Sequence, residues 1–472
     1  MGQLDTQSEV TQPLKISLTQ DLARWASELQ FKDLPDDVIH QVKRLVLDYY
    51  CAVIAGSTTS TSRVVREYFC ESEASGIASI VGTPFGISAA NAAFVNGTAA
   101  HGMELDDGYT PGSYHPGAAC IPAIMAVAET YQSDYQDVVL AIVVSYEISC
   151  RLARAGHPHT WKNGFHNTGI NGVLGAAAGV GKLLQLDTKK MTWALGMAGS
   201  FSSGLFEFLG EGAEIKRIHP GKTARDGVIV AELAKRGIDG PRTGLEGRNG
   251  YFKAYANAKA DMASVMDGLG STWELLQTYV KPYPCCRHLH APIDGILALK
   301  TQDTIDLANI TRILIETHQV AARHAHTTHE TILDAQMSIP FAVATALLHD
   351  QVGLEAFSHA ARHHPNMADL ISKVEVEITD DMQRAYPKQR PANIIIEFKD
   401  GSRLTKLVPQ PYGEPDHPLD DSALTSKFHA ICDTLIGQER VNNIAKACWD
   451  LDFPEIFKLT KLKPEEVKEA QL

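Results

Sequence analysis

Five basic or imidazole side chains occur within residues 216–225 of a chain whose formal net charge is −13. They are Lys216, Arg217, His219, Lys222 and Arg225. Such donors pair well with carboxylate and phosphate oxygens, so the segment predicts a site for a small polyanion. Pro220 and Gly221 favour a tight entry into a helix over 222–236, whose first-turn amides would also attract an anion. A solvated basic turn is the alternative interpretation.

Imidazoles and carboxylates also gather between residues 101 and 115. This segment holds His101, Glu104, Asp106, Asp107, Tyr109 and His115. If a helix from Ala89 runs through Glu104, the Asp106–Asp107 pair closes it, and negative charge is unfavourable at a helix C-terminus. An unfavourable arrangement suggests a chemical role, and two adjacent carboxyls can keep one of them neutral. A solvated acidic turn stays open as the alternative.

Two further segments combine groups that could do chemistry. His166 directly precedes a Gly- and Ala-rich run over 169–184, although a single histidine is more often structural. Residues 281–292 bring together Tyr283, Cys285, Cys286, Arg287, His288 and His290. The adjacent cysteines do not have the ligand spacing of a zinc or iron–sulfur site, so no metal or cofactor is predicted, and both thiols are expected to pack as small apolar residues.

The elements that must position these side chains are mainly helices. Apolar periodicity predicts helices over 88–104, 119–131, 136–155, 169–184, 190–209 and 222–236. The pattern becomes mixed near residue 270, with strands expected over 279–284 and 310–317 and a hairpin over 393–404 on an Asp-Gly turn. Helical spacing returns after Gly413. The expected fold class is therefore mainly α, with a smaller α+β part.

Composition narrows the class of protein. With 472 residues, two or three domains are expected. The acidic balance and the lack of a basic stripe argue against nucleic-acid binding. The apolar run over 137–148 is too short to span a bilayer, so no membrane association is expected. The eight cysteines show no disulfide framework and the N-terminus no secretory segment. These features predict a cytoplasmic protein, or a mitochondrial one in a eukaryote.

Five motifs, in this order, resemble the MmgE/PrpD family, which includes 2-methylcitrate dehydratases, cis-aconitate decarboxylases and iminodisuccinate epimerases. The motifs occupy residues 94–107, 115–116, 164–166, 216–227 and 283–286. The resemblance covers nearly the whole chain. It implies a large all-helical domain made of 1–270 and 409–472, an inserted α+β lid domain over 271–408, a homodimer, and chemistry without a metal or organic cofactor.

The resemblance also implies site residues. Catalytic roles are expected for His115, His166, Lys216, Asp106 and Asp107. Substrate contacts are expected for His219, Arg217, Lys222, Tyr109, Tyr283, Arg287 and His288. The helix-forming segments of these residues should bring them to one cleft, with residues 281–290 facing Lys216. One position departs from the pattern, because Gly108 follows the Asp pair where family dehydratases and decarboxylases often have Thr or Tyr.

The expected reaction moves a proton at a carbon beside a carboxylate. Cations would neutralise the carboxylates of a di- or tricarboxylate substrate, and imidazoles would carry the proton. These residue types do not separate the family's reactions. A lyase that dehydrates a citrate or alkylcitrate is the first expectation and a cis-aconitate decarboxylase the alternative. Isomerisation or epimerisation of a dicarboxylate comes third, and a non-enzymatic interaction protein last.

Overall fold

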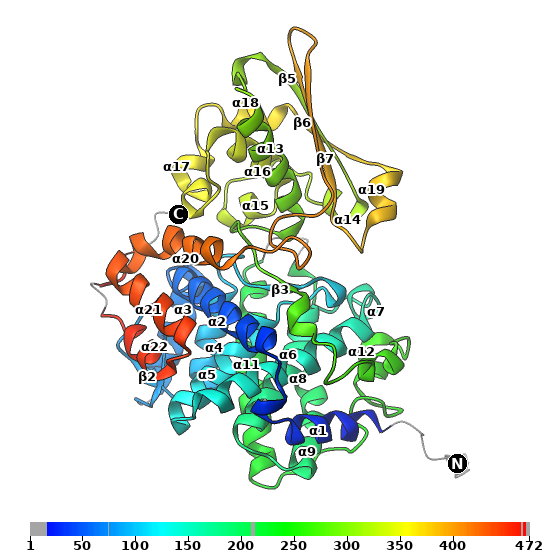
Figure 1. The fold of residues 1–472 in the computed structure, drawn as a ribbon, viewed down its shortest axis with the longest axis vertical. Coiled ribbons are helices and arrows are strands. Elements are labelled where there is room, and N and C mark those ends of the chain that lie inside the picture. The colour runs from blue at the N-terminus through cyan, green and yellow to red at the C-terminus, as the bar shows by residue number, and fades with distance from the viewer. Residues whose placement is uncertain (1–16, 74, 209–212, 464–465, 469–472) are drawn as a thin grey trace, which may run out of the picture.

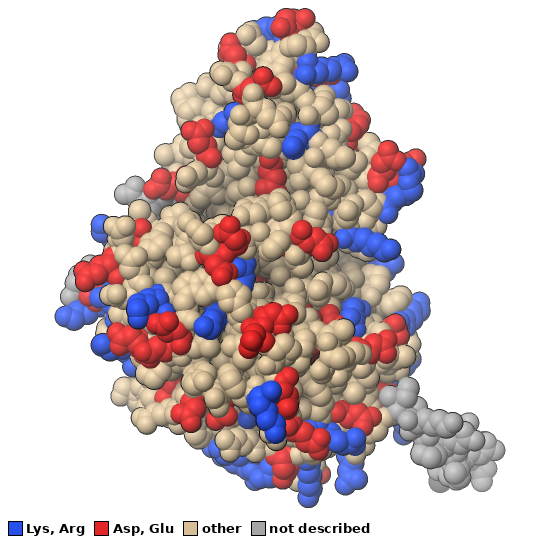
Figure 2. Space-filling model, in the orientation of Figure 1, with Lys and Arg blue, Asp and Glu red and all other residues tan. Residues whose placement is uncertain are grey.

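The computed structural model describes residues 17–73, 75–208, 213–463 and 466–468 (Figure 1). The predicted fold class is confirmed, since the described part is mainly helical with a small mixed sheet in its C-terminal region. Each helix within these ranges is too short or too polar to cross a membrane. Acidic and basic side chains are interspersed over the face drawn in Figure 2, in keeping with the lack of a basic stripe in the sequence.

The larger, lower part of the molecule in Figure 1 consists mainly of helices. From the N-terminal half they are α1 (Leu18–Glu28), α2 (Asp36–Gly56), α3 (Ser60–Ser72), α4 (Ala89–Ala100), α5 (Pro116–Tyr131), α6 (Tyr135–Gly156), α7 (His159–Lys162), α8 (Asn167–Leu183), α9 (Thr188–Phe201), α11 (Ile215–Lys235) and α12 (Tyr251–Ala256). The C-terminal helices are α20 (Asp421–Ile436), α21 (Gln438–Asp450) and α22 (Phe453–Leu459). Of these, α20 and α21 pack on α2, so the two ends of the chain share one hydrophobic core.

Small residues let the central helices approach closely, as the sequence predicts for the run over 169–184. The helix α8 packs against α5, α6 and α11. A Cβ atom on Gly172 would lie 2.7 Å from Ala119 Cβ and 2.6 Å from Thr223 Oγ1. Larger side chains there would force the helices apart, and with them the helix ends that carry the candidate site.

The smaller part, at the top of Figure 1, is built around a four-stranded sheet. Its strands are β5 (Ile310–Thr317), β6 (Val374–Ile378), β7 (Ala392–Phe398) and β8 (Arg403–Val408), in the order β6-β5-β7-β8, with only β5 and β6 parallel. Its helices are α13 (His290–Gln302), α14 (Gln319–Ala322), α15 (Ile332–Gln336), α16 (Ile339–Leu348), α17 (His359–Arg362), α18 (Met367–Ser372) and α19 (Asp380–Ala385). Alternate residues of β7, such as Ile394 and Ile396, are buried in a second hydrophobic core, and α13 packs on β7 and β8.

The predicted strand over 310–317 and the Asp-Gly hairpin are confirmed, because β7 and β8 pair directly and Gly401 has φ +83° in the turn. The strand expected over 279–284 is mostly wrong. Only β4 (Thr278–Tyr279) pairs there, with β3 (Gly108–Tyr109), and Pro282 and Pro284 cannot donate to a ladder. Another short pair joins β1 (Ala78–Ser79) to β2 (Gly86–Ile87). The domain boundaries at 270 and 408 remain a prediction.

Three predicted helix ends are wrong. The helix α4 ends at Ala100 and not at Glu104, which has φ +55°. The helix predicted over 190–209 corresponds to α9, which already ends at Phe201. The helix expected to begin after Pro220 and Gly221 begins instead at Ile215, with Pro220 inside it. Packing against α4 and α8 holds this helix together, and a Cβ on Gly221 would overlap the carbonyl oxygen of Phe94. Tertiary packing thus overrides a local signal for a helix start.

Candidate active site

Three helix beginnings bring candidate residues together. His115 directly precedes α5 and His166 directly precedes α8, while Lys216 lies in the first turn of α11. The helix α11 packs against both α5 and α8, which places these beginnings near one another. The positive ends of the helix dipoles therefore add to the charge of Lys216, and the arrangement favours an anion.

A buried carboxylate joins two lysines at the centre of the site. Lys216 Nζ donates to Glu104 Oε1, and Lys281 Nζ lies 3.3 Å from Glu104 Oε2. Lys281 is 1% exposed and Glu104 is 2% exposed. Burial alone would raise the pKa of Glu104, but the two lysines and His101 hold it well below its usual range. Glu104 is therefore a fixed negative charge that offsets two buried ammonium groups.

Asp106 accepts hydrogen bonds from one histidine and lies close to another. His101 Nδ1 lies 2.7 Å from Asp106 Oδ2, and His115 Nδ1 lies 3.4 Å from the same oxygen. Although burial opposes its charge, His101, His115 and Lys281 hold the pKa of Asp106 well below its usual range. Asp106 is thus an ionised carboxylate that orients imidazoles. An ionised carboxylate cannot act as a proton donor.

His115 has a fixed tautomer. Its Nδ1–H points to the backbone oxygen of Asp107 at 2.7 Å, which leaves Nε2 with a free lone pair. Burial lowers the pKa of His115 to about 3, and the opposing attraction of Asp106 does not restore it. A neutral imidazole with an available Nε2 can accept a proton or a hydrogen bond from a ligand.

A second imidazole pair lies beside the first. The Nδ1 atoms of His166 and His219 are 2.9 Å apart, so one ring donates to the other. The ring centroids of His166 and His101 are 6.3 Å apart. Burial, and then the neighbouring His219, lower the pKa of His166, while burial and His101 lower that of His219 to about 4. Both rings are neutral in the unliganded site, since a further positive charge is unfavourable there.

Asp107 has a different environment from Asp106. Its two carboxyl oxygens accept from Gly117 N–H and Tyr146 O–H, each at 2.8 Å. Burial, and then the nearby Asp48, raise its pKa to about 8. The adjacent Asp106, which the sequence suggested as the cause of a neutral carboxyl, contributes less than burial and Asp48. Asp107 contacts α5 and α6 through its carboxyl group, and its backbone oxygen accepts from His115.

Several predicted contact residues are engaged elsewhere. Tyr109 donates to Glu274, Tyr283 O–H lies 2.7 Å from Asp294, and Arg287 Nε lies 2.9 Å from Glu414. Lys222 lies 2.5 Å from Asp226 on its own helix. These partners tie the four side chains into the protein framework, so their expected substrate contacts stay predictions without support from the geometry.

Arg217 and His288 contact other side chains but still have polar atoms without a partner. Arg217 is 5% exposed and its guanidinium reaches Glu214 and Gln336, whose side chain also donates to Met103 O. His288 stacks on His324 at a centroid distance of 5.8 Å. Within the part of the chain that the structure describes, Arg217 Nε and His288 Nδ1 are buried without a hydrogen-bond partner.

Sequence reasoning missed three members of the site: His101, Glu104 and Lys281. His101 and Glu104 stand inside a motif that had been singled out, but no contact could be assigned to them. The pair formed by Lys281 and Glu104 joins positions 177 residues apart. A signal was present in the unusual run of charged residues on either side of Leu105. Lys281 begins the segment that was expected to face Lys216, but no role had been assigned to its side chain.

One group within the described residues has the composition of a metal site. Ligand atoms of His101, Asp106 and His115 lie within 4.8 Å of one another. However, the Nδ1–H of His115 is directed to Asp107 O, and Lys281 Nζ lies 3.9 Å from Asp106 Oδ1. A divalent cation would have to displace the hydrogen bonds and lie beside an ammonium group, so the residues do not fit a cation well.

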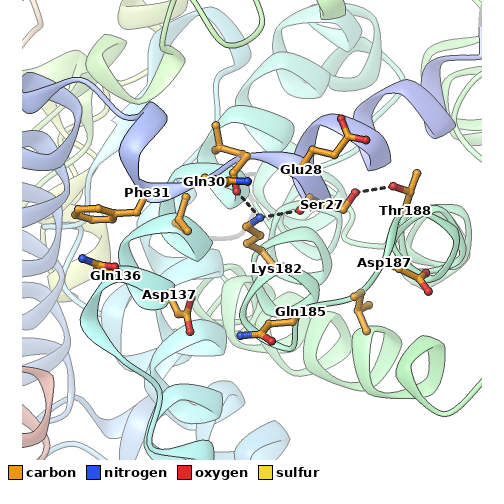
Figure 3. Close-up of a pocket in the computed structure, with 13 residues that line it drawn as sticks. Ser27, Glu28, Gln30, Phe31, Gln136, Asp137, Lys182, Gln185, Asp187 and Thr188 are labelled. Carbon is orange, nitrogen blue, oxygen red and sulfur yellow. Dashed lines mark hydrogen bonds between the residues drawn. The ribbon is translucent and has the colours of Figure 1, made fainter.

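A separate pocket of about 550 Å³ lies at the end of α1, among α1, α6 and the loop after α8 (Figure 3). Lys182 points into it, but its Nζ lies 3.0 Å from Ser27 O and 2.6 Å from Leu29 O and so satisfies the last carbonyls of α1. This lysine therefore stabilises a helix end. The imidazole and carboxylate cluster is not part of this pocket.

Comparison with known proteins agrees with the motifs. The MmgE/PrpD N-terminal domain matches residues 20–262, and the MmgE/PrpD C-terminal domain matches residues 283–451. A cis-aconitate decarboxylase of Aspergillus terreus is 26% identical, with 95% of each chain covered. The human cis-aconitate decarboxylase is 28% identical, with 92% of each chain covered. The cis-aconitate decarboxylase-like protein oryM of Aspergillus oryzae is 26% identical, with 92% of this chain and 95% of that protein covered.

Proposed function

Since the chain belongs to the MmgE/PrpD family, we propose that it is a lyase that removes one carboxylate of cis-aconitate, or of a closely similar tricarboxylate, as CO₂. The observation that carries this proposal is similarity over more than nine-tenths of the chain to proteins named cis-aconitate decarboxylase. The sequence alone favoured dehydration, with decarboxylation as the alternative. The relatives support the alternative better.

The site suits a substrate with several carboxylates. Lys216, Lys281 and three helix beginnings supply positive potential, while Glu104 is the carboxylate that balances the lysines in the free protein. A substrate carboxylate can share or take over these ammonium groups. Since most of these groups are buried, each such contact would be stronger than it is in water.

Binding of a polyanion would also change the imidazoles. The pKa values of His115, His166 and His219 lie below the ordinary value chiefly because the rings are buried, and neighbouring positive or imidazole groups add to the effect. Negative charge on a ligand favours the protonated rings and raises these pKa values. The site therefore takes up a proton together with its substrate and holds a proton donor when it is needed.

In the proposed step, the bond between the departing carboxylate and its carbon breaks, and CO₂ leaves without the bonding electron pair. That pair stays on the carbon, is delocalised towards the remaining unsaturated acid, and is stabilised by Lys216 and Lys281. A protonated His166 or His115 then delivers a proton to carbon, which yields an unsaturated dicarboxylate. Asp106 and His101 orient the ring of His115 for this transfer.

The test is to incubate the purified protein separately with cis-aconitate, citrate, 2-methylcitrate and iminodisuccinate, with NMR of the acids and measurement of released CO₂. We expect CO₂ and an unsaturated dicarboxylate in equal amounts from cis-aconitate, and slower or no turnover of the others. Loss of water from 2-methylcitrate without CO₂ from any acid would instead establish the dehydratase expectation. Inversion of iminodisuccinate alone would support the epimerase.

A further inference from the structure

Two adjacent cysteines have opposite environments. Cys285 is fully buried, and burial raises its pKa well above the usual range. Cys286 is half-buried, and its Sγ lies 3.6 Å from His324 Nε2. All eight cysteines lie in described parts of the chain and are free thiols. Both residues pack on the second hydrophobic core, as expected, but Cys286 is only partly buried there and its sulfur also faces an imidazole.

The imidazole that faces Cys286 is held in place. His324 Nδ1 lies 3.0 Å from Met337 O and donates to it, while its own backbone oxygen accepts from Ile339 N–H at 2.8 Å. With Nδ1 committed as a donor, Nε2 is the atom that takes the proton from Sγ. His324 is 8% exposed, so water competes little for this contact.

The position of Cys286 in the chain is also compatible with a thiolate. Cys286 is the residue before the short helix η5 (Arg287–Leu289), which leads directly into α13. A cysteine at the start of a helical segment and beside an imidazole is the environment in which thiols ionise near neutral pH. Burial opposes ionisation, but His324 and then Lys216 lower the pKa of Cys286 to about 7.

Cys286 lies against the candidate active site. Its N–H donates to Gln336 O at 2.9 Å, and the Gln336 side chain links Arg217 to Met103 O, just before Glu104. Arg217 is nine-tenths buried or more, and its Nε has no partner in the described structure. Lys216 and Arg390 also place positive charge near the sulfur of this partly buried residue, which would draw an anionic reagent to it.

We propose that Cys286 and His324 form a thiolate–imidazolium pair, and that Cys286 is a covalent modification site for small carboxylates carrying an electrophilic carbon. In the step itself, the proton moves from Sγ to His324 Nε2, the sulfur attacks the electrophilic carbon, and a C–S bond forms. With iodoacetate the C–I bond breaks and iodide leaves with its electron pair. No oxidant or reductant is consumed, and the product is a thioether beside Lys216.

Iodoacetate and the neutral iodoacetamide test this proposal on the full chain, with peptide mass spectrometry as the readout. We expect Cys286 to be carboxymethylated at least tenfold faster than Cys285. We also expect the ratio of the iodoacetate rate to the iodoacetamide rate at Cys286 to exceed that of free cysteine, because the site is cationic. Equal labelling of Cys286 in the native and the urea-unfolded protein, or a ratio no higher than that of free cysteine, would overturn the proposal.

Variants distinguish reactivity that depends on the Cys286–His324 pair from reactivity that depends only on exposure of the thiol. His324→Gln should slow labelling of Cys286 by about tenfold at pH 7, while Cys285→Ser serves as the matched control and should leave it unchanged. Cys286→Ser should turn over substrate and resist inactivation by iodoacetate. If Cys286→Ser is still inactivated at the original rate, the modified site lies elsewhere. Labelling is measured without turnover, so this test stands apart from the proposed decarboxylation.

The pH dependence of labelling gives an independent readout. The charged or titratable groups around Sγ are His324, Lys216, Lys281, Arg390 and Cys285. The rate should reach half its maximum near pH 7, whereas an ordinary thiol does so at about 8.5. Citrate should slow labelling, because it would occupy the adjacent cationic site. A pH midpoint of labelling at or above that of an ordinary thiol would contradict the thiolate–imidazolium pair. Labelling that saturating citrate does not slow would contradict the position of Cys286 beside the candidate active site.

Discussion

The ring of Tyr279 covers Gly108 where the short strands β3 and β4 pair. A Cβ on Gly108 would lie 2.8 Å from Tyr279 Cε1 and closer still to Cζ and the hydroxyl oxygen. This contact gives a physical reason for the glycine that follows the Asp pair, where the family resemblance would imply Thr or Tyr. The tyrosine occupies the space that such a side chain would need.

Gly108→Thr should therefore destabilise the protein by about 1–3 kcal/mol, the usual effect of overpacking a filled site. Gly108→Thr combined with Tyr279→Ala should recover much of that loss beyond the sum of the single changes, because the two side chains compete for one space. Thermal and urea unfolding of the four proteins measure this coupling. Additive effects would mean that Tyr279 does not exclude a larger residue at this position.

Replacement of Lys216 should impair turnover much more than folding. Lys216→Ala removes a cation from the proposed transition state and should lower kcat/KM by about a hundredfold or more. Glu104 still keeps Lys281 as a partner, so the thermal midpoint should change modestly. Lys235→Ala, at the far end of the same helix, is the control and should keep wild-type turnover. Near-normal activity of the Lys216 variant would remove this residue from the mechanism.

We expect His166 to contribute to turnover by carrying a proton. His166→Gln keeps a polar side chain of similar reach but cannot carry a proton near neutral pH, so it should lower kcat by about a hundredfold. The matched control His159→Gln lies on the short helix α7 of the same region. Steady-state kinetics on cis-aconitate, with the fold checked by circular dichroism, provide the measurement. A His166 variant with wild-type kcat would exclude this ring as proton donor.

The parts of the fold that depend on local chemistry could be predicted. The hairpin of β7 and β8 follows from alternating apolar residues around Asp400 and Gly401, and the close packing of α8 follows from its glycines. The start of α11 could not be predicted from the sequence. Pro220 is a strong local signal for a helix start, and only the packing of Gly221 against α4 overrides it.

The candidate site, too, could be predicted only in part from the sequence. Residue types predicted that imidazoles and cations would gather, and the helix beginnings bring His115, His166 and Lys216 together. Which groups pair was not predictable, because the Lys281–Glu104 contact depends on how the two parts of the chain meet. Nor could sequence distinguish Asp106 from Asp107, since one faces imidazoles and the other faces Tyr146.

Glu104→Gln should destabilise the protein by roughly 3–5 kcal/mol, as expected when a buried ion pair loses one partner. Two ammonium groups, those of Lys216 and Lys281, would then lack their shared carboxylate. A polyanion can replace it, so citrate should raise the thermal midpoint of this variant by more degrees than that of the wild type. Equal citrate shifts in the two proteins would show that the ligand does not bind these lysines.

The titration of Asp107 should be visible in folding stability. Its pKa is about 8 in the folded protein, above the unfolded value of 3.8, so the folded state keeps a proton that the unfolded state has lost. Stability from this group is fully present below about pH 4 and is lost as the pH rises towards 8, at up to roughly 1.4 kcal/mol per pH unit.

The free energy of unfolding of the wild type minus that of Asp107→Asn should therefore fall from pH 5 to pH 8 and level off above it, since groups common to both proteins largely cancel. Asp106→Asn is the control. The folded-state pKa of Asp106 is depressed, so its contribution is present above its unfolded pKa and should stay constant over the same range. Urea unfolding at each pH measures both differences. If the Asp107 difference is as flat as that of Asp106, Asp107 is ionised in the folded protein and supplies no proton to the site.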